Sequence, residues 1–170
     1  MNKLVLSLLR WYKKEKRELP FRGISDPYKI WLSEIILQQT RIVTGSPYYE
    51  RFIEKYPNVM LLASSSEDEV LKMWEGLGYY SRARNLHKTA KIIVEEFDSI
   101  FPSNYETLIK LPGIGDYTAS AISSFSINEI NPVVDGNVYR FLSRLMGLNL
   151  SLIHISEPTR RYASSDAGFC

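Results

Sequence analysis

Apolar residues recur at helical spacing along nearly the whole chain, and no segment shows the strict alternation of a β-strand. Residues near 2–16, for example, place four large apolar side chains on one stripe, which predicts a first helix. Loops with proline and glycine, such as residues 18–29, separate the helical segments. The sequence therefore predicts an all-α fold of many short helices and short loops.

Composition restricts the cellular setting and the possible cofactors. No segment approaches the roughly 20 unbroken apolar residues of a membrane span, and the apolar-then-basic N-terminus reverses the order of a signal peptide. We therefore expect a cytoplasmic protein with no membrane partner. The net charge of +2 does not by itself argue for a nucleic-acid partner. The single cysteine, Cys170, excludes an internal disulfide or a multi-cysteine site, so we expect no metal ligands.

The segment "LPGIGDYTA", residues 111–119, lies between two amphipathic segments and carries two glycines. Gly113 and Gly115 permit backbone angles that are closed to other residues, and they keep side chains off the surface. Their amides would then point outward at a helix N-terminus, which suits a DNA phosphate. An ordinary helix–helix turn with a glycine cap explains the same residues equally well.

Two acidic residues stand out by their surroundings. Glu34 lies in the apolar segment "IWLSEIILQQT", where desolvation should raise its pKa and suit it to act as a general acid. Asp135 precedes a helical run, where it would cap the helix and be favoured as a carboxylate by the helix dipole. Taken singly, each is better explained as a structural residue. Together, a protonated and an ionised carboxyl group are what cleavage of a glycosidic bond requires.

At these residues the chain resembles the helix-hairpin-helix DNA glycosylases, and more closely the MutY-type adenine glycosylases that act on adenine opposite guanine or 8-oxoguanine. The matching stretches follow the family order across roughly residues 10–147, and their joint occurrence is far more specific than any one motif. They are "ELPFR", "DPYKIWLSEIILQQTRI", "PYYERFIEKYP", "MWEGLGYYSRARNLHKTA", "LPGIGDYTASAI" and "VVDGNVYRFLSR".

The resemblance implies catalytic roles. Glu34 matches the acid that protonates the adenine, and Asp135 matches the carboxylate that stabilises the oxocarbenium ion, with a transient covalent adduct as an alternative. Asn137 matches a polar residue that organises this site. In relatives that also nick the strand, a lysine stands where this chain has Tyr117, and it forms a Schiff base with the sugar. Tyrosine cannot do so, which predicts a monofunctional enzyme in which Tyr117 instead hydrogen-bonds Asp135.

The resemblance also implies contacts with double-stranded DNA that contains an A:G or A:8-oxoguanine mispair. It assigns wedging beside the opposite base to Gln39, Thr40, Leu77 and Tyr79, proximity to the adenine pocket to Arg22 and Leu37, and phosphate binding to Gly113 and Gly115. Loop packing for Leu77 and Tyr79, and core packing for Leu37, are the alternatives. The basic residues of segment 82–91 face either phosphates or solvent. We expect a monomer.

The chain departs from the family after its catalytic segment. The resemblance implies a four-cysteine 4Fe–4S cluster and a C-terminal domain that recognises 8-oxoguanine, and neither is encoded here, so a cluster is expected only in a full-length protein. Residues 150–160, "LSLIHISEPTR", resemble a translated sequencing adaptor, and we expect residues 150–170 to be a non-native tail. The expected units are residues 1–24, part of an incomplete cluster-type module, a six-helix module at 25–130 with its hairpin at 108–122, and the catalytic loop at 131–149.

We also expect the apolar stripe of the first helix to stay exposed.

Two other functions remain open from the sequence. One is a bifunctional glycosylase/lyase of the endonuclease III kind, against which Tyr117 and "LQQT" argue. The other is an inactive DNA-binding fragment that keeps the phosphate grip and releases no base.

Overall fold

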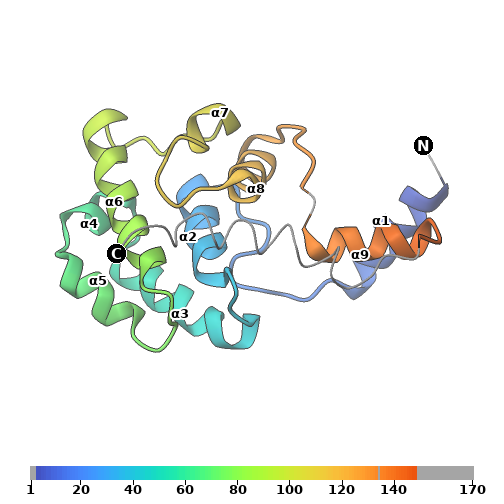
Figure 1. Ribbon diagram of the computed structural model, residues 1–170, viewed down its shortest axis with the longest axis horizontal. Coiled ribbons are helices and arrows are strands. Elements are labelled where there is room, and N and C mark those ends of the chain that lie inside the picture. The colour runs from blue at the N-terminus through green and yellow to red at the C-terminus, as the bar shows by residue number, and fades with distance from the viewer. Residues whose placement is uncertain (1–2, 134, 149–170) are drawn as a thin grey trace.

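The computed structural model describes residues 3–133 and 135–148, and every regular element in this part of the chain is a helix, as predicted (Figure 1). The predicted tail at 150–170 lies outside the described residues. The helices are α1 (Lys3–Glu15), α2 (Pro27–Leu37), α3 (Ile42–Lys55), α4 (Val59–Ser64), α5 (Glu67–Trp74), α6 (Ser81–Glu96), α7 (Tyr105–Leu108), α8 (Asp116–Ile127) and α9 (Gly136–Leu145). None of these helices is long and apolar enough to span a bilayer.

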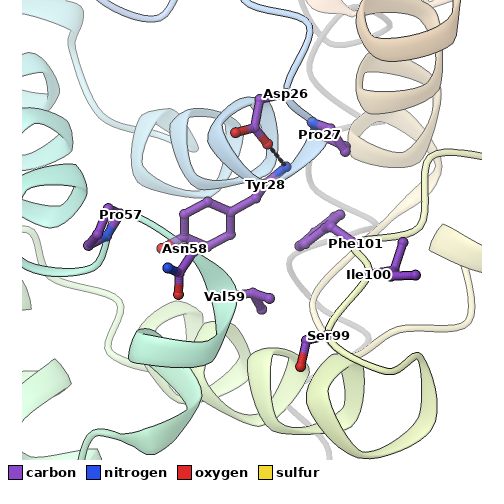
Figure 2. A pocket seen from close by; sticks show the side chains of 9 residues that line it. All are labelled: Asp26, Pro27, Tyr28, Pro57, Asn58, Val59, Ser99, Ile100 and Phe101. Atoms are coloured by element: carbon purple, nitrogen blue, oxygen red, sulfur yellow. Dashed lines mark hydrogen bonds between the residues drawn. The ribbon is translucent and has the colours of Figure 1, made fainter.

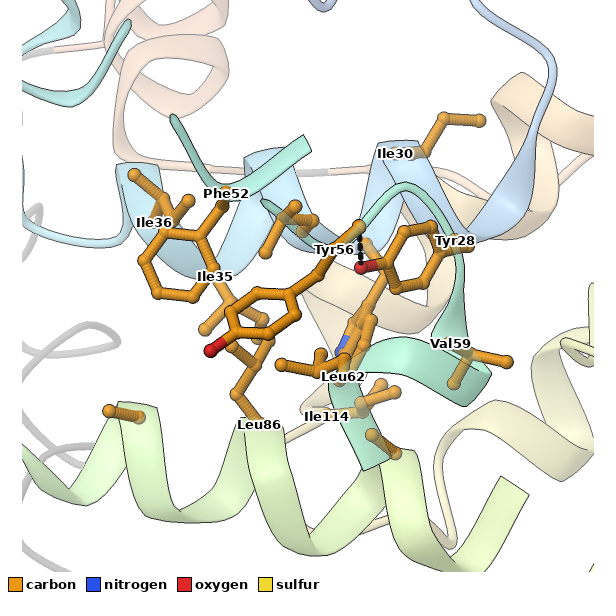
Figure 3. Close-up of a cluster of buried hydrophobic side chains, with 14 of the residues drawn as sticks. Tyr28, Ile30, Ile35, Ile36, Phe52, Tyr56, Val59, Leu62, Leu86 and Ile114 are labelled. Carbon is orange, nitrogen blue, oxygen red and sulfur yellow. Dashed lines mark hydrogen bonds between the residues drawn. The ribbon is translucent and has the colours of Figure 1, made fainter. Parts of the chain in front are cut away.

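Helix α2 lies at the centre of the core and packs against α8, α3 and α6. It buries seven of its residues, including Trp31, which has no exposed surface. Around it gather the buried side chains of the neighbouring helices, among them Phe52, Leu62 and Leu86 (Figure 3). Burying one such large apolar side chain contributes about 1.5–3 kcal/mol relative to leaving it exposed. An apolar helix of this kind must therefore be enclosed by other helices.

Local sequence signals set where some of the helices begin. Asp26 caps α2 by accepting from the Tyr28 backbone N–H, and Pro27 opens the helix where no N–H is needed. Ser66 and Glu69, three residues apart, form a capping box at the start of α5, as this spacing indicates. The same spacing at residues 103–106 indicates a second capping box, which is wrong: α7 begins after Asn104, whose side chain makes no capping bond. The first backbone N–H of α7, at Tyr105, instead donates to the Glu129 carboxylate at 3.1 Å.

The apolar pattern of residues 30–43 predicts one continuous helix, but this segment does not form one. Helix α2 ends at Leu37, and Gln39 adopts a left-handed backbone conformation with φ of 54°. Helix α3 then begins at Ile42 and carries Pro47 in its interior rather than at its start. The chain therefore turns out of α2 through a short exposed loop at residues 38–41.

The hairpin between α7 and α8 rests on α6. Thr89 donates a hydrogen bond of 2.7 Å to the carbonyl of Pro112, and a Cβ added at Gly113 would come within 2.8 Å of Asn85 Cβ. Gly113 has φ of 75°, so this glycine is required both by its backbone and by its neighbour. Gly115 has φ of −89°, so the expectation that its backbone needs glycine is wrong. Its lack of a side chain only leaves the start of α8 open.

Helices α1 and α9 lie at one end of the molecule, away from the helices that enclose α2 (Figure 1). Helix α1 buries none of its residues, and Leu8 and Leu9 are 43% and 47% exposed, which confirms the expectation for this stripe. In α9 only Ser143 is buried. The domain limits at residues 24 and 130 stay predictions.

We expect Gly113→Ala to lower the free energy of unfolding by about 2 kcal/mol, because alanine is strained at this φ and its Cβ would collide with Asn85. Urea unfolding followed by circular dichroism measures the change. Gly115→Ala is the matched control, since a Cβ there meets nothing within 4 Å, and it should cost less than about 1 kcal/mol as a changed N-cap. Equal losses in both variants would contradict the account of the hairpin.

Candidate active site

Glu34 lies in the apolar helix α2 and is largely withdrawn from water. Burial raises its pKa to about 7, and the nearby carboxyl group of Asp135 raises it further. A substantial fraction of Glu34 therefore keeps its proton near neutral pH. This placement agrees with its expected role as an acid, and the proximity of Asp135 could not be seen in α2 alone.

Asp135 caps the N-terminus of α9. One carboxylate oxygen accepts a hydrogen bond of 2.7 Å from the Val138 backbone N–H, and the other accepts one of 3.0 Å from the Asn137 side-chain amide. The two bonds fix the orientation of the carboxylate. Asn137 thus lies where the resemblance predicted, beside the carboxylate that it would organise.

Tyr117, in the first turn of α8, lies close to both acids. Burial raises the pKa of its hydroxyl to about 12, and the negative charges of Glu34 and Asp135 act in the same direction. The hydroxyl therefore stays protonated at neutral pH. Among the described residues, no hydrogen bond joins Tyr117 to Asp135, so that part of the expectation is not met in this conformation.

Two contacts explain why residues so far apart in sequence converge. The Gln38 side-chain amide donates to Thr118 Oγ1 at 3.4 Å, which ties the end of α2 to the first turn of α8. After α8, the Asn131 side-chain amide donates to Ser123 Oγ at 3.0 Å, which folds the returning loop onto α8. These contacts bring the Glu34 turn, Tyr117 and the approach to Asp135 together.

Two of the four residues expected to wedge into DNA are prominent on the surface. Tyr79 is 66% exposed and has φ of 47°, and Gln39 is exposed with φ of 54°. Thr40 is half-buried and donates to the carbonyl of Gln38. Leu77 is only 9% exposed and belongs to the core, so in this conformation its side chain has the packing role that was the alternative.

Arg22 and Leu37 are not brought together. Arg22 is exposed and donates to the carbonyl of Arg17 at 2.8 Å, with Tyr12 of α1 5.7 Å from its guanidinium carbon. It therefore contacts the N-terminal segment and none of the acids. Leu37 packs against Gly45, where an added Cβ would lie 2.7 Å from its Cδ2. Leu37 is half-buried and lies outside the buried core cluster, so its place near an adenine pocket stays a prediction.

The basic segment of α6 does not present one cationic face. His87 is 2% exposed, and one ring nitrogen lies 2.9 Å from the carbonyl of Ser65. Arg82 is turned toward the two exposed loops and donates to their backbone. Sequence reasoning missed this role of Arg82. The available signal was an arginine in the first turn of a helix directly after the glycine-bearing loop "GLGYY".

The phosphate-binding role of the hairpin stays a prediction, and the structure shows only how the start of α8 is built. Gly115 precedes the helix and leaves the first-turn amides open, because nothing would meet a Cβ there within 4 Å. Asp116 occupies the same turn, and its carboxylate accepts a hydrogen bond from the Tyr105 hydroxyl.

The residues present do not fit the iron–sulfur cluster that the family resemblance implies. Such a cluster is held by four thiolates, and the chain has one cysteine, Cys170. Within residues 3–133 and 135–148, no three histidine, cysteine or acidic side chains gather as a metal site would require.

A surface pocket of about 310 Å³ opens at the other end of α2 and is distinct from the acids (Figure 2). Its lining includes Tyr28, Phe101 and the capping residue Asp26, and none of the predicted site residues. Since Asp26 already accepts from the Tyr28 backbone, this pocket offers no acid pair. The candidate active site is therefore the one formed by Glu34, Tyr117 and Asp135, and not this pocket.

We expect the chain to lose stability as pH rises from about 4.5 to 7. The folded protein retains the Glu34 proton up to about pH 7 while the unfolded chain releases it near 4.5, so the folded state binds more protons in this window. Glu34→Gln should remove this loss and be the more stable protein at pH 8. Urea unfolding at pH 5 and pH 8 tests this, with Glu54→Gln, an exposed position on α3, as the control. An unchanged difference between the two pH values in Glu34→Gln would contradict the burial of this acid.

The sequence of the chain is similar to those of curated proteins named adenine DNA glycosylase. The adenine DNA glycosylase of Buchnera aphidicola subsp. Baizongia pistaciae (strain Bp) is 47% identical over 152 residues, and that of Homo sapiens is 44% identical over 151 residues. These alignments cover 89% and 84% of this chain but 43% and 28% of the relatives. The chain thus spans less than half the length of these curated relatives.

Solved structures share the arrangement of helices. A thermostable thymine-DNA glycosylase superposes with a TM-score of 0.77 at 26% identity, over 82% of this chain and 65% of that one. A non-covalent endonuclease III–DNA complex gives a TM-score of 0.71 at 20% identity, over 91% and 74%, which shows a shared fold. The family profile described as HhH-GPD superfamily base excision DNA repair protein matches residues 32–157, which include both acids and the hairpin. The chain belongs to the HhH-GPD superfamily of base excision DNA repair proteins.

Proposed function

We propose that this chain carries the excision chemistry of an adenine DNA glycosylase. It hydrolyses the N-glycosidic bond of adenine mispaired with guanine or 8-oxoguanine in double-stranded DNA. The observation that carries the proposal is the placement of Glu34, whose pKa is raised to about 7, within electrostatic range of the oriented carboxylate of Asp135. The 44–47% identity to proteins named adenine DNA glycosylase supports adenine as the base.

Glu34 acts as the general acid. Near neutral pH a substantial fraction of Glu34 holds a proton, and the apolar surroundings of α2 favour the transfer of that proton to a bound base. Protonation turns the adenine into a better leaving group, so its bond to the deoxyribose weakens. In a purely structural glutamate, the same burial would only destabilise the folded protein.

Asp135 stabilises the positive charge that develops on the sugar. Its carboxylate is held by Val138 and Asn137 from the protein side, so it is oriented before substrate arrives. Water then attacks the sugar carbon that adenine has left and passes its proton to the Glu34 carboxylate, which leaves an abasic site. Tyr117 keeps its proton and serves as a neutral hydrogen-bonding group beside both acids.

The proposed enzyme is monofunctional, works as a cytoplasmic monomer, and leaves the DNA strand intact. The position that would carry a Schiff-base lysine is Tyr117, whose phenol cannot form an imine. We propose that no cofactor takes part in the chemistry of this chain, because both reacting carboxyl groups are its own. A 4Fe–4S cluster belongs to a longer protein that supplies four cysteines.

We expect Asp135→Asn to slow adenine release by a factor on the order of 10²–10³, because the amide carries no charge to oppose the developing cation. Asparagine is also a good N-cap, so α9 should persist and the variant should fold. Single-turnover release from a duplex with one A:8-oxoguanine pair measures the rate. Asp98→Asn, an exposed residue beyond α6, is the control. An unchanged rate in Asp135→Asn would point to the alternative, a DNA-binding fragment without catalysis.

We expect the single-turnover rate to be constant below pH 7 and to fall roughly tenfold per pH unit above it, because only protonated Glu34 donates. Glu34→Gln should abolish release over the whole range. Product strands should remain uncut until alkali is added, and borohydride should trap no covalent complex. Cleavage without alkali would favour the bifunctional glycosylase/lyase instead.

A further inference from the structure

Arg82 holds the loop that follows α2. One terminal nitrogen of its guanidinium donates to the carbonyls of Ile35 at 3.0 Å and Ile36 at 3.2 Å, and to the carbonyl of Gln38. The same nitrogen lies 3.5 Å from Thr40 Oγ1. The last carbonyls of α2 lack helical partners, so the guanidinium satisfies them and fixes where the loop at 38–41 leaves the helix.

The second terminal nitrogen of Arg82 holds the loop between α5 and α6. It donates to the carbonyls of Leu77 at 3.3 Å and Gly78 at 3.4 Å. The Trp74 indole N–H also donates to the Gly78 carbonyl, at 2.9 Å. The rings of Trp74 and Tyr79 lie 5.1 and 5.7 Å from the guanidinium carbon. One side chain thus bonds two loops that are far apart in sequence.

Each loop presents one exposed side chain from an unfavourable backbone conformation. Gln39 has φ of 54° and Tyr79 has φ of 47°, which residues other than glycine rarely adopt. Such conformations persist only where surrounding contacts enforce them, and they cluster at functional sites. In both loops, the contacts of Arg82 lie at the residues directly beside the strained one.

We propose that Arg82 is a positioning residue for mispair recognition, which sets the separation of Gln39 and Tyr79 so that both enter the duplex together. The proposal rests on the proposed function. Inserting side chains into a stacked duplex costs free energy. A flexible loop would change its own conformation instead of inserting its side chain between the bases. A planar guanidinium with donors on two terminal nitrogens can bridge both loops, whereas the single ammonium of lysine cannot.

The first test measures the loops without DNA. We expect Arg82→Lys to speed hydrogen exchange of the amides at 38–41 and 76–80 together, by roughly tenfold, because each loop loses charge-assisted hydrogen bonds. Exchange in the hairpin at 111–116 should stay the same. Arg84→Lys is the matched control on the same helix, where the arginine pairs with Glu67 at 3.4 Å and its side chain is 57% exposed.

The second test measures insertion into DNA. A duplex carries 2-aminopurine next to an A:8-oxoguanine pair, and its fluorescence rises when wedging unstacks the probe. We expect Arg82→Lys to lower affinity for this duplex roughly tenfold and to reduce the fluorescence rise, while affinity for a fully paired duplex is unchanged. Arg84→Lys should match the unsubstituted protein in both readouts.

Exchange that rises in neither loop or in only one would overturn the proposal, and so would mispair affinity equal to that of the unsubstituted protein. A variant unfolded at 4 °C would overturn it too, because Arg82 would then support the whole helical module rather than the two loops. If the unsubstituted protein itself fails to unstack the probe, the proposed function fails, and the exchange measurement still decides whether Arg82 joins the loops.

Discussion

The enclosure of α2 is the constraint on which the rest of the structure depends. This helix is apolar on nearly every side, and Trp31 and Leu32 have no exposed surface at all. Helices α3, α6 and α8 must surround it, and that requirement places the start of α8 beside the turn of α2 that holds Glu34. The same apolar surroundings raise the pKa of this acid to about 7. Stability and chemistry thus arise from one packing arrangement.

Helix α6 performs a second organising task. Arg82 in its first turn bonds the loops at 38–41 and 76–80, while Asn85 and Thr89, farther along the helix, support the hairpin at 111–115. The spacing of these residues, three or four positions apart, places them on one face of the helix. The proposed wedge and the proposed phosphate grip are therefore attached to one rigid support. The proposed insertion of side chains into a duplex needs such fixed distances between the contact points.

Several features could be predicted from local sequence because they depend on local chemistry. The all-α fold follows from the spacing of apolar residues, and the cap at Ser66 follows from the pattern with Glu69. The break after Leu37 could not be predicted in this way, because the apolar pattern continues through it while the backbone reverses at Gln39. The burial of Leu77 likewise depends on neighbours that are distant in sequence. The role of Arg82 was missed because its partners are backbone carbonyls, which no sequence pattern displays.

The sequence by itself determined the residue types: one acid in an apolar helix, one at a helix start, two glycines in a turn, and tyrosine at residue 117. It also determined the membership in the superfamily, since the motifs occur in order. Only the tertiary structure decided that Glu34 and Asp135 meet, because helix packing and the loop bonded to Ser123 bring them together. It also decided that Gly113, and not Gly115, is sterically required, because the reason is the neighbouring Asn85 of α6. Proximity across helices is set by how apolar faces pack, and that is a property of the whole fold.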